Sequence, residues 1–174
     1  LFPAGFNNLN PAFMPLCIQA VQAAVERVCP TAKRVLIIAE NHTRNLFYLE
    51  SLETLRGIFE QAGLDARIAS IREDLDAAET IALPSGKECH LSPLERNGNR
   101  VGLGDFSPCL VLLNNDLSSG RPAILEDLEQ QVVPPLKAGW STRKKSDHFT
   151  HYSAVANEFA AQLEIDPWLV SPLT

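Results

Sequence analysis

Two clusters of polar side chains each follow a short apolar run. Residues 35–39 (Val-Leu-Ile-Ile-Ala) are followed by Glu40, Asn41, His42, Thr43, Arg44 and Asn45. Residues 109–113 are followed by Asn114, Asn115 and Asp116. Both runs are short and rich in branched side chains, which predicts strands buried on both faces of a sheet. Ligands bind at the carboxyl ends of such strands, so neighbouring strands would gather both clusters in one crevice.

The residue types in these clusters suit a polar, anionic ligand. Arg44 carries a planar guanidinium that matches a carboxylate or a phosphate. Backbone N–H groups at a strand-to-helix junction also favour an anion, and the amides of Asn114 and Asn115 can orient a ligand by hydrogen bonds. The alternative stays open that these are ordinary polar junctions, with Thr43 as a helix cap and Arg44 as a surface charge.

A third cluster combines Trp140 with three cations at residues 143–145. An aromatic side chain beside cations suits a phosphate or a carboxylate, whereas a solvated charge run is the alternative. His148 and His151 lie one helical turn apart, but no third ligand is spaced to join them, so no metal site is predicted.

The elements that position these clusters alternate between helix and strand. Apolar spacing predicts helices at about 13–28, at 49–62 after a cap at Thr43 or Asn41, at 123–131 after Pro122, and after a cap at Ser146. Strands are expected at 35–39, 64–71 and 110–113. Turn signals predict a small antiparallel hairpin excursion over about 80–101. The pattern as a whole predicts an α/β domain with a mainly parallel sheet.

Composition narrows the class of protein. The 174 residues suit one α/β domain spanning 1–174. A net charge of −6 without a basic stripe argues against a nucleic-acid partner. No apolar segment has the ~20 residues needed to cross a bilayer, so no membrane partner is expected and the cytoplasm is the predicted compartment. The four scattered cysteines are expected to be reduced thiols. We interpret both chain ends as cut, which predicts a fragment of a longer protein.

Four separated motifs resemble those of one enzyme family. They are the segments 1–11, Glu40-Asn-His-Thr-Arg-Asn45, 111–118 and Ala138-Gly-Trp-Ser-Thr-Arg-Lys-Lys-Ser146. Together they resemble the proteobacterial type of glutamate–cysteine ligase over the whole chain. Position 4 is Ala where the family has Gly, which puts the conformation of that loop in question. The resemblance implies a three-layer Rossmann-like domain of the pre-ATP-grasp type within a longer ATP-grasp ligase of glutathione synthesis.

The resemblance also implies substrates and roles. Glutamate and cysteine would be the substrates, with ATP and Mg²⁺ bound mainly by parts outside this chain, so that this fragment alone would be inactive. Arg44 would bind a carboxylate, and Arg143 or Lys144 would stabilise the charge of the transferred phosphate. The other substrate-binding residues would be Asn7, Asn8, Glu40, Asn41, His42, Asn45, Asn114, Asn115 and Asp116.

Two other functions remain open at this point. One is a non-catalytic α/β binding domain whose polar junctions are structural. The other is a different ATP-grasp ligase that joins a carboxylate to another amine. Specific glutamate binding would separate the first from the ligases, and the identity of the amine would separate the ligases from each other. A homo-oligomer is compatible with each of them.

Overall fold

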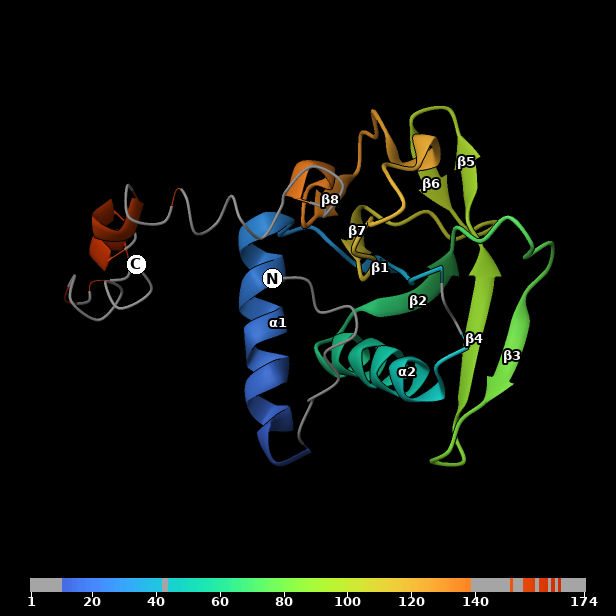
Figure 1. Ribbon diagram of the computed structural model, residues 1–174. Helices are drawn as coiled ribbons and strands as arrows, with labels where there is room; N and C mark the ends of the chain where they lie inside the picture. The colour runs from blue at the N-terminus through green and yellow to red at the C-terminus, as the bar shows by residue number, and fades with distance from the viewer. Residues whose placement is uncertain are drawn as a thin grey trace.

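A six-stranded sheet with the order β3-β4-β2-β1-β7-β8 organises the chain (Figure 1). The computed structural model describes residues 11–41, 44–138, 151, 155–158, 160–162, 164 and 166. The strands are β1 (Arg34–Ile38), β2 (Asp65–Ser70), β3 (Glu79–Ala82), β4 (Glu88–Pro93), β7 (Leu110–Leu113) and β8 (Gln131–Val133). Strand β3 runs antiparallel to β4, and all other neighbours in this sheet are parallel. A separate antiparallel pair joins β5 (Glu95–Asn97) to β6 (Arg100–Gly102).

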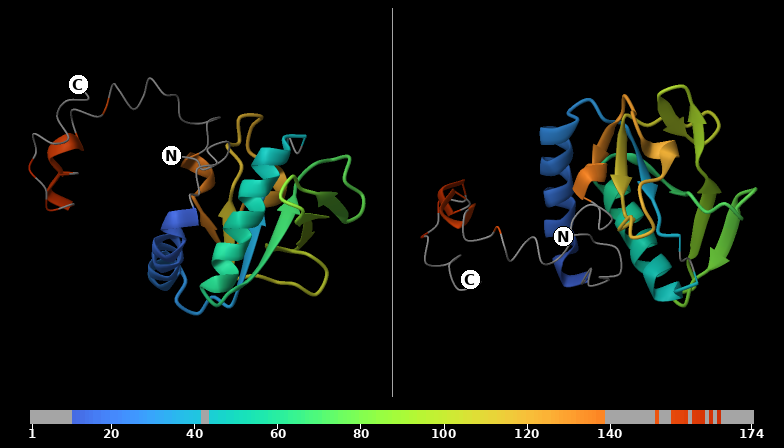
Figure 2. Two further views of the ribbon diagram at one scale, coloured as in Figure 1. Left: turned by 90° about the horizontal axis from the view of Figure 1, so that it is seen from below. Right: turned by 45° about the horizontal axis from the view of Figure 1, so that its top comes forward.

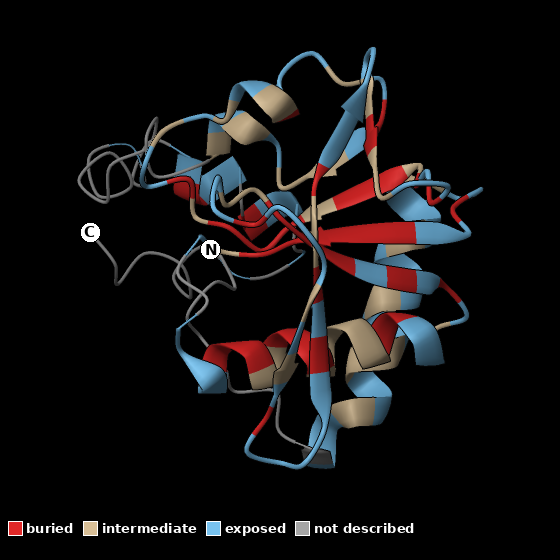
Figure 3. Ribbon diagram, turned by 90° about the vertical axis from the view of Figure 1, so that its right-hand side faces the viewer, coloured by how far each residue is buried: buried red, intermediate tan, exposed pale blue. Residues whose placement is uncertain are grey.

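Strand β1 is buried on both faces, as its sequence predicts. Val35, Leu36, Ile37 and Ile38 are all 0% exposed, and buried residues concentrate along the central strands (Figure 3). Val35 and Ile37 belong to the core on one face, while Leu36 and Ile38 belong to the core on the other. Each such side chain contributes roughly 1.5–3 kcal/mol by leaving water, so β1 anchors both layers.

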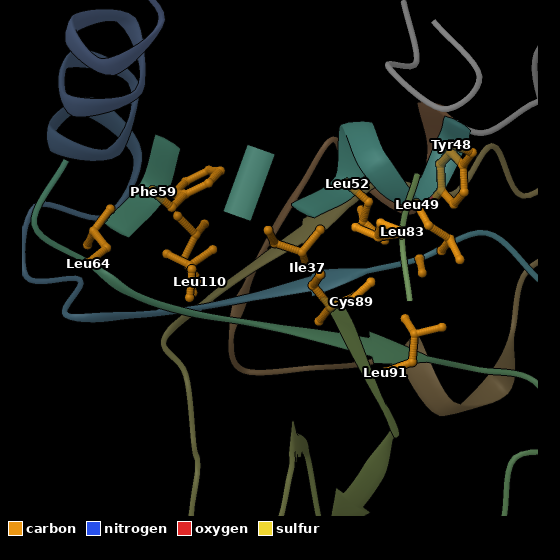
Figure 4. Packing of buried hydrophobic residues seen from close by; sticks show 14 of the residues in the cluster. Ile37, Tyr48, Leu49, Leu52, Phe59, Leu64, Leu83, Cys89, Leu91 and Leu110 are labelled. Atoms are coloured by element: carbon orange, nitrogen blue, oxygen red, sulfur yellow. The ribbon is translucent and has the colours of Figure 1, made fainter. Parts of the chain in front are cut away.

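The two long helices pack on one face of the sheet (Figures 1 and 2). They are α1 (Met14–Val28), which follows the 3-10 turn η1 (Pro11–Phe13), and α2 (Leu46–Gln61). Leu49, Leu52 and Phe59 of α2 face Ile37 and Leu110 of the sheet (Figure 4). Among the described residues, no helix is long and apolar enough to cross a membrane.

Among the residues that the structure describes, no long helix covers the opposite face of the sheet. Leu94, Val101, Phe106 and Leu125 pack there against the central strands, and they come from the β5–β6 hairpin and the loops around it. The 3-10 helix η2 (Ala123–Leu125) lies in this layer, and η3 (Leu136–Ala138) follows β8. The fold is therefore the predicted mixed α/β architecture, a mainly parallel sheet with a small antiparallel pair.

The predicted hairpin excursion is only partly correct. Strands β3 and β4 form the expected antiparallel hairpin around Gly86, whose φ of 82° suits glycine. However, β4 belongs to the main sheet, where it pairs in parallel with β2. Strand β4 joins the main sheet because every second side chain over residues 88–91 is buried. Cys89 and Leu91 are 0% exposed and pack into the core beneath α2. Only β5 and β6 form the small separate sheet.

The helix predicted over 123–131 is wrong. Helical structure stops at Leu125, Glu126 is extended, and Asp127 has a φ of 53°. Residues 131–133 then form β8 beside β7. The buried Gln130 amide fixes this path, because its Nε2 donates to the carbonyls of Val101 at 2.8 Å and Pro108 at 2.7 Å.

The final predicted helix is described only in part. Residues 155–158 and 160–162 are helical, and Ala156 and Ala160 are buried. The predicted cap, Ser146, lies outside the described residues.

The buried Cys89 thiol predicts a loss of stability at alkaline pH. Burial, with a smaller effect of the Glu53 carboxylate, raises the pKa of this thiol from 9.0 to about 12. The unfolded chain therefore ionises first, so the stabilisation is complete below pH 9.0 and is lost as the pH rises toward 12. We expect the free energy of urea unfolding to fall by roughly 1–2 kcal/mol between about pH 8 and about pH 10.5 from this group. Cys89→Ala should flatten that decrease and Cys17→Ala should not; equal slopes in both variants would contradict the assignment.

Candidate functional site

The two polar clusters meet where the order of the sheet reverses. Strand β1 pairs with β2 on one side and with β7 on the other, from Val35 opposite Leu110 to Ile38 opposite Leu113. The chain leaves β1 toward β2 and returns to the other side of β1 through β7. Open α/β sheets bind ligands at such a switch point. The expectation that the two clusters lie together is confirmed.

Hydrogen bonds join the ends of β1 and β7 directly. The Asn115 Nδ2 donates to the carbonyl oxygen of Ala39 at 2.9 Å and to Asn41 Oδ1 at 3.2 Å. The Asp116 backbone N–H donates to Glu40 Oε1 at 2.7 Å. Four residues predicted from the sequence, Glu40, Asn41, Asn115 and Asp116, are therefore brought into one network.

Tyr48 ties the first turn of α2 to both strand ends. Its hydroxyl accepts from the Glu40 N–H at 2.8 Å and donates to Asn114, whose carbonyl oxygen and Oδ1 lie at 3.1 and 3.0 Å. Tyr48 and Asn114 are both 4% exposed. Burial raises the pKa of Tyr48, so the hydroxyl keeps the proton that it donates. Tyr48 was not among the predicted site residues, although an aromatic residue with a polar tip one turn after the cluster was an available signal.

Asn45 is the N-cap of α2. Its Oδ1 accepts from the backbone N–H groups of Phe47 at 3.1 Å and Tyr48 at 3.3 Å. The predicted caps, Thr43 and Asn41, are therefore wrong. Asn41 instead accepts from Asn115 at the other strand end. Capping satisfies N–H groups that the helix cannot pair internally, and it holds Tyr48 at the junction.

A cleft of about 490 Å³ opens at the carboxyl ends of β2, β1 and β7. It is lined by Asn41, Asn115, Leu117, residues 71–74 and residues 119–122. Asn115 is 4% exposed, so this amide is fixed within the protein at the edge of the cleft. The volume and the polar lining suit a small polar ligand.

The charged residues of the cleft fall into two groups. Arg72 donates from Nε and Nη2 to Asp74 at 2.9 Å each and from Nη1 to Glu79 at 3.3 Å. These contacts raise the pKa of Arg72, and the bond from Arg72 lowers the pKa of the Asp74 carboxyl. Glu73 and Arg121 also line the cleft, and neither forms an ion pair within the part of the chain that the structure describes.

Comparison with known proteins assigns the family. The protein-family model described as GshA, glutamate-cysteine ligase, matches residues 1–174 of the chain. The chain belongs to this family. The crystal structure of a "Putative gamma-glutamylcysteine synthetase" from Methylobacillus flagellatus KT is similar, with a TM-score of 0.83 and 54% identity. The match covers 97% of this chain and 40% of that chain, so this chain spans less than half of that protein. No curated protein matched the sequence.

The other predicted site residues of this glutamate–cysteine ligase family member either form no hydrogen bond with the network described above or lie outside the described residues. Arg44 is exposed, and its charge is one of the smaller causes that lower the pKa of Asp74. Asn7, Asn8, His42, Arg143 and Lys144 lie outside the described residues. The ligand-binding roles of all these residues stay predictions.

Arg72 and Arg121 were missed because single arginines in loops form no recognisable pattern.

Within the described ranges, no group of three or more His, Cys, Asp or Glu side chains could hold a metal ion.

Replacing Tyr48 by Phe tests the hydroxyl bridge. The variant keeps the ring but leaves the Glu40 N–H and Asn114 without this partner, and unsatisfied buried polar groups cost about 1–3 kcal/mol. We expect the free energy of urea unfolding to fall by that amount in Tyr48→Phe. Thr80→Val removes an exposed hydroxyl whose bond to His90 Nδ1 at 2.9 Å lies at the surface, and it should change stability by less than about 0.5 kcal/mol. Equal stability of Tyr48→Phe and the original protein would show that the bridge contributes nothing.

Replacing Asn45 tests its role as the cap of α2. Asn45→Ala should lower the free energy of unfolding by about 1 kcal/mol, while Asn45→Ser, which is also a good cap, should retain most of it. Thermal and urea unfolding of the three proteins measure this. If Ser and Ala destabilise equally, the oxygen of Asn45 does not act as the cap.

Proposed function

We propose that the protein containing this chain ligates L-glutamate to L-cysteine with ATP, and that the cleft described above binds amino-acid substrate. The observation that carries the proposal is the position of this cleft at the switch point of the sheet, in a chain of the glutamate–cysteine ligase family. Fixed amides and charged side chains at such a position can recognise a small zwitterion.

In the proposed reaction, the side-chain carboxylate of glutamate takes the terminal phosphoryl group of ATP, which yields an acyl phosphate and ADP. The cysteine amine then attacks the acyl carbon, phosphate leaves, and the nitrogen loses a proton. The product is γ-glutamylcysteine. Holding the reactants in the correct geometry accounts for much of the acceleration of such steps.

The contribution of this chain is to bind and orient. Asn115 is held by Ala39, and Asn41 is held by Asn115, so both amides are positioned before a ligand arrives. Arg44 and the cleft arginine Arg121 supply positive charge for a carboxylate. We assign ATP and Mg²⁺ mainly to other parts of the longer protein. The cytoplasm stays the expected compartment.

The direct test is ADP release by the longest natural chain that contains this segment. With ATP and Mg²⁺ present, release should require both glutamate and cysteine, and mass spectrometry should detect γ-glutamylcysteine. If another amine replaces cysteine, a different carboxylate–amine ligase is the correct function. If a folded sample releases no ADP with any amino acid, the ligase proposal fails and a non-catalytic binding domain remains.

A further inference from the structure

Two opposite charges in the cleft have no ion-pair partner among the described residues. Glu73 follows β2 and Arg121 follows β7, with β1 between these two strands. They do not form an ion pair with each other. The neighbouring charges Arg72 and Asp74 are already paired. The cleft therefore presents a negative group from its β2 side and a positive group from its β7 side.

The backbone around Arg121 is constrained on both sides. Gly120 has a φ of 117°, a conformation that favours glycine, and its N–H donates to the carbonyl of Leu117 at 3.1 Å. Pro122 fixes its own φ at −70°. On the other side, Arg72 holds the loop next to Glu73 through its two bonds to Asp74. The side chains of Glu73 and Arg121 therefore both extend from segments whose backbone is restrained.

We propose that Arg121 binds the α-carboxylate of glutamate and that Glu73 binds its α-ammonium group. The inference rests on the proposed function and adds the orientation of the substrate. An α-amino acid carries opposite charges on one carbon, which complements two opposite charges that face one cleft. This orientation leaves the side-chain carboxylate of glutamate free to react.

The chemistry of the two amino acids selects glutamate as the occupant. A carboxylate next to an ammonium group raises the pKa of that amine and keeps it protonated. The cysteine amine must lose its proton to attack the acyl carbon, so a partner such as Glu73 would oppose the reaction. The amine of glutamate does not react, so the same contact only strengthens its binding.

Steady-state kinetics of the longest natural chain test the two contacts. In Arg121→Ala and in Glu73→Gln, we expect the KM for glutamate to rise about 10- to 100-fold, the range for losing a charge-assisted hydrogen bond. The KM for cysteine should stay within about 2-fold. Arg121→Lys should recover part of the loss. Arg27→Ala and Glu26→Gln, which alter exposed charges on α1, are the matched controls and should leave both constants unchanged.

Glutamate analogues separate the two contacts. Glutarate lacks the ammonium group, so Glu73→Gln should not weaken its inhibition, whereas Arg121→Ala should. The compound 4-aminobutyrate lacks the α-carboxylate, so Arg121→Ala should not weaken its inhibition. An unchanged KM for glutamate in both variants would overturn the inference, as would a rise confined to the KM for cysteine.

Calorimetry distinguishes failure of this inference from failure of the proposed function. If the unaltered protein binds glutamate but releases no ADP, the ligase activity fails, and loss of glutamate binding in both variants still supports the two contacts. If glutamate binds equally to the unaltered protein and to both variants, the contacts are wrong whatever the activity. No glutamate binding and no turnover in the unaltered protein would overturn both.

Discussion

The parallel pairing of β1 with β7 is the constraint on which the site depends. Ile38 lies opposite Leu113, so the residues that follow the two strands leave the sheet at the same level. Residues 76 positions apart can then form hydrogen bonds, as the Glu40 side chain does with the Asp116 backbone N–H. A shift of one residue in this register would turn the buried side chains of β7 to the opposite face, so core packing also fixes the site.

The polar junction is part of the core rather than an addition to its surface. Tyr48, Asn114 and Asn115 are nearly fully buried, and within the described part of the chain no buried side-chain nitrogen or oxygen lacks a hydrogen-bond partner. A satisfied buried network is rigid because each group is costly to leave unpaired. The exposed charges Glu73 and Arg121 extend from segments that the Arg72–Asp74 pair and the residues Gly120 and Pro122 restrain, which is the arrangement that a binding site requires.

The sequence predicted those parts of the fold whose signals are local. Residues 35–38 and 110–113 form buried strands because branched apolar runs of that length have few alternatives, and the convergence of Asn41 with Asn115 followed from the parallel topology. The predicted helix over 123–131 failed because the pairing of β8 with β7 and the bonds of Gln130 are long-range. Arg121 was missed because a single arginine in a loop forms no pattern, and the bonds of Tyr48 to Asn114 were missed because they join residues 66 positions apart.

A crystal structure of the longest natural chain with bound glutamate would show whether the cleft binds this substrate. We expect glutamate in the cleft at the ends of β2, β1 and β7, within hydrogen-bond distance of the Asn41 or Asn115 amide. Its α-carboxylate should face Arg121 and its ammonium group should face Glu73. Glutamate bound elsewhere, with this cleft holding only water, would contradict the account and leave the junction of β1 and β7 as a structural feature of the sheet.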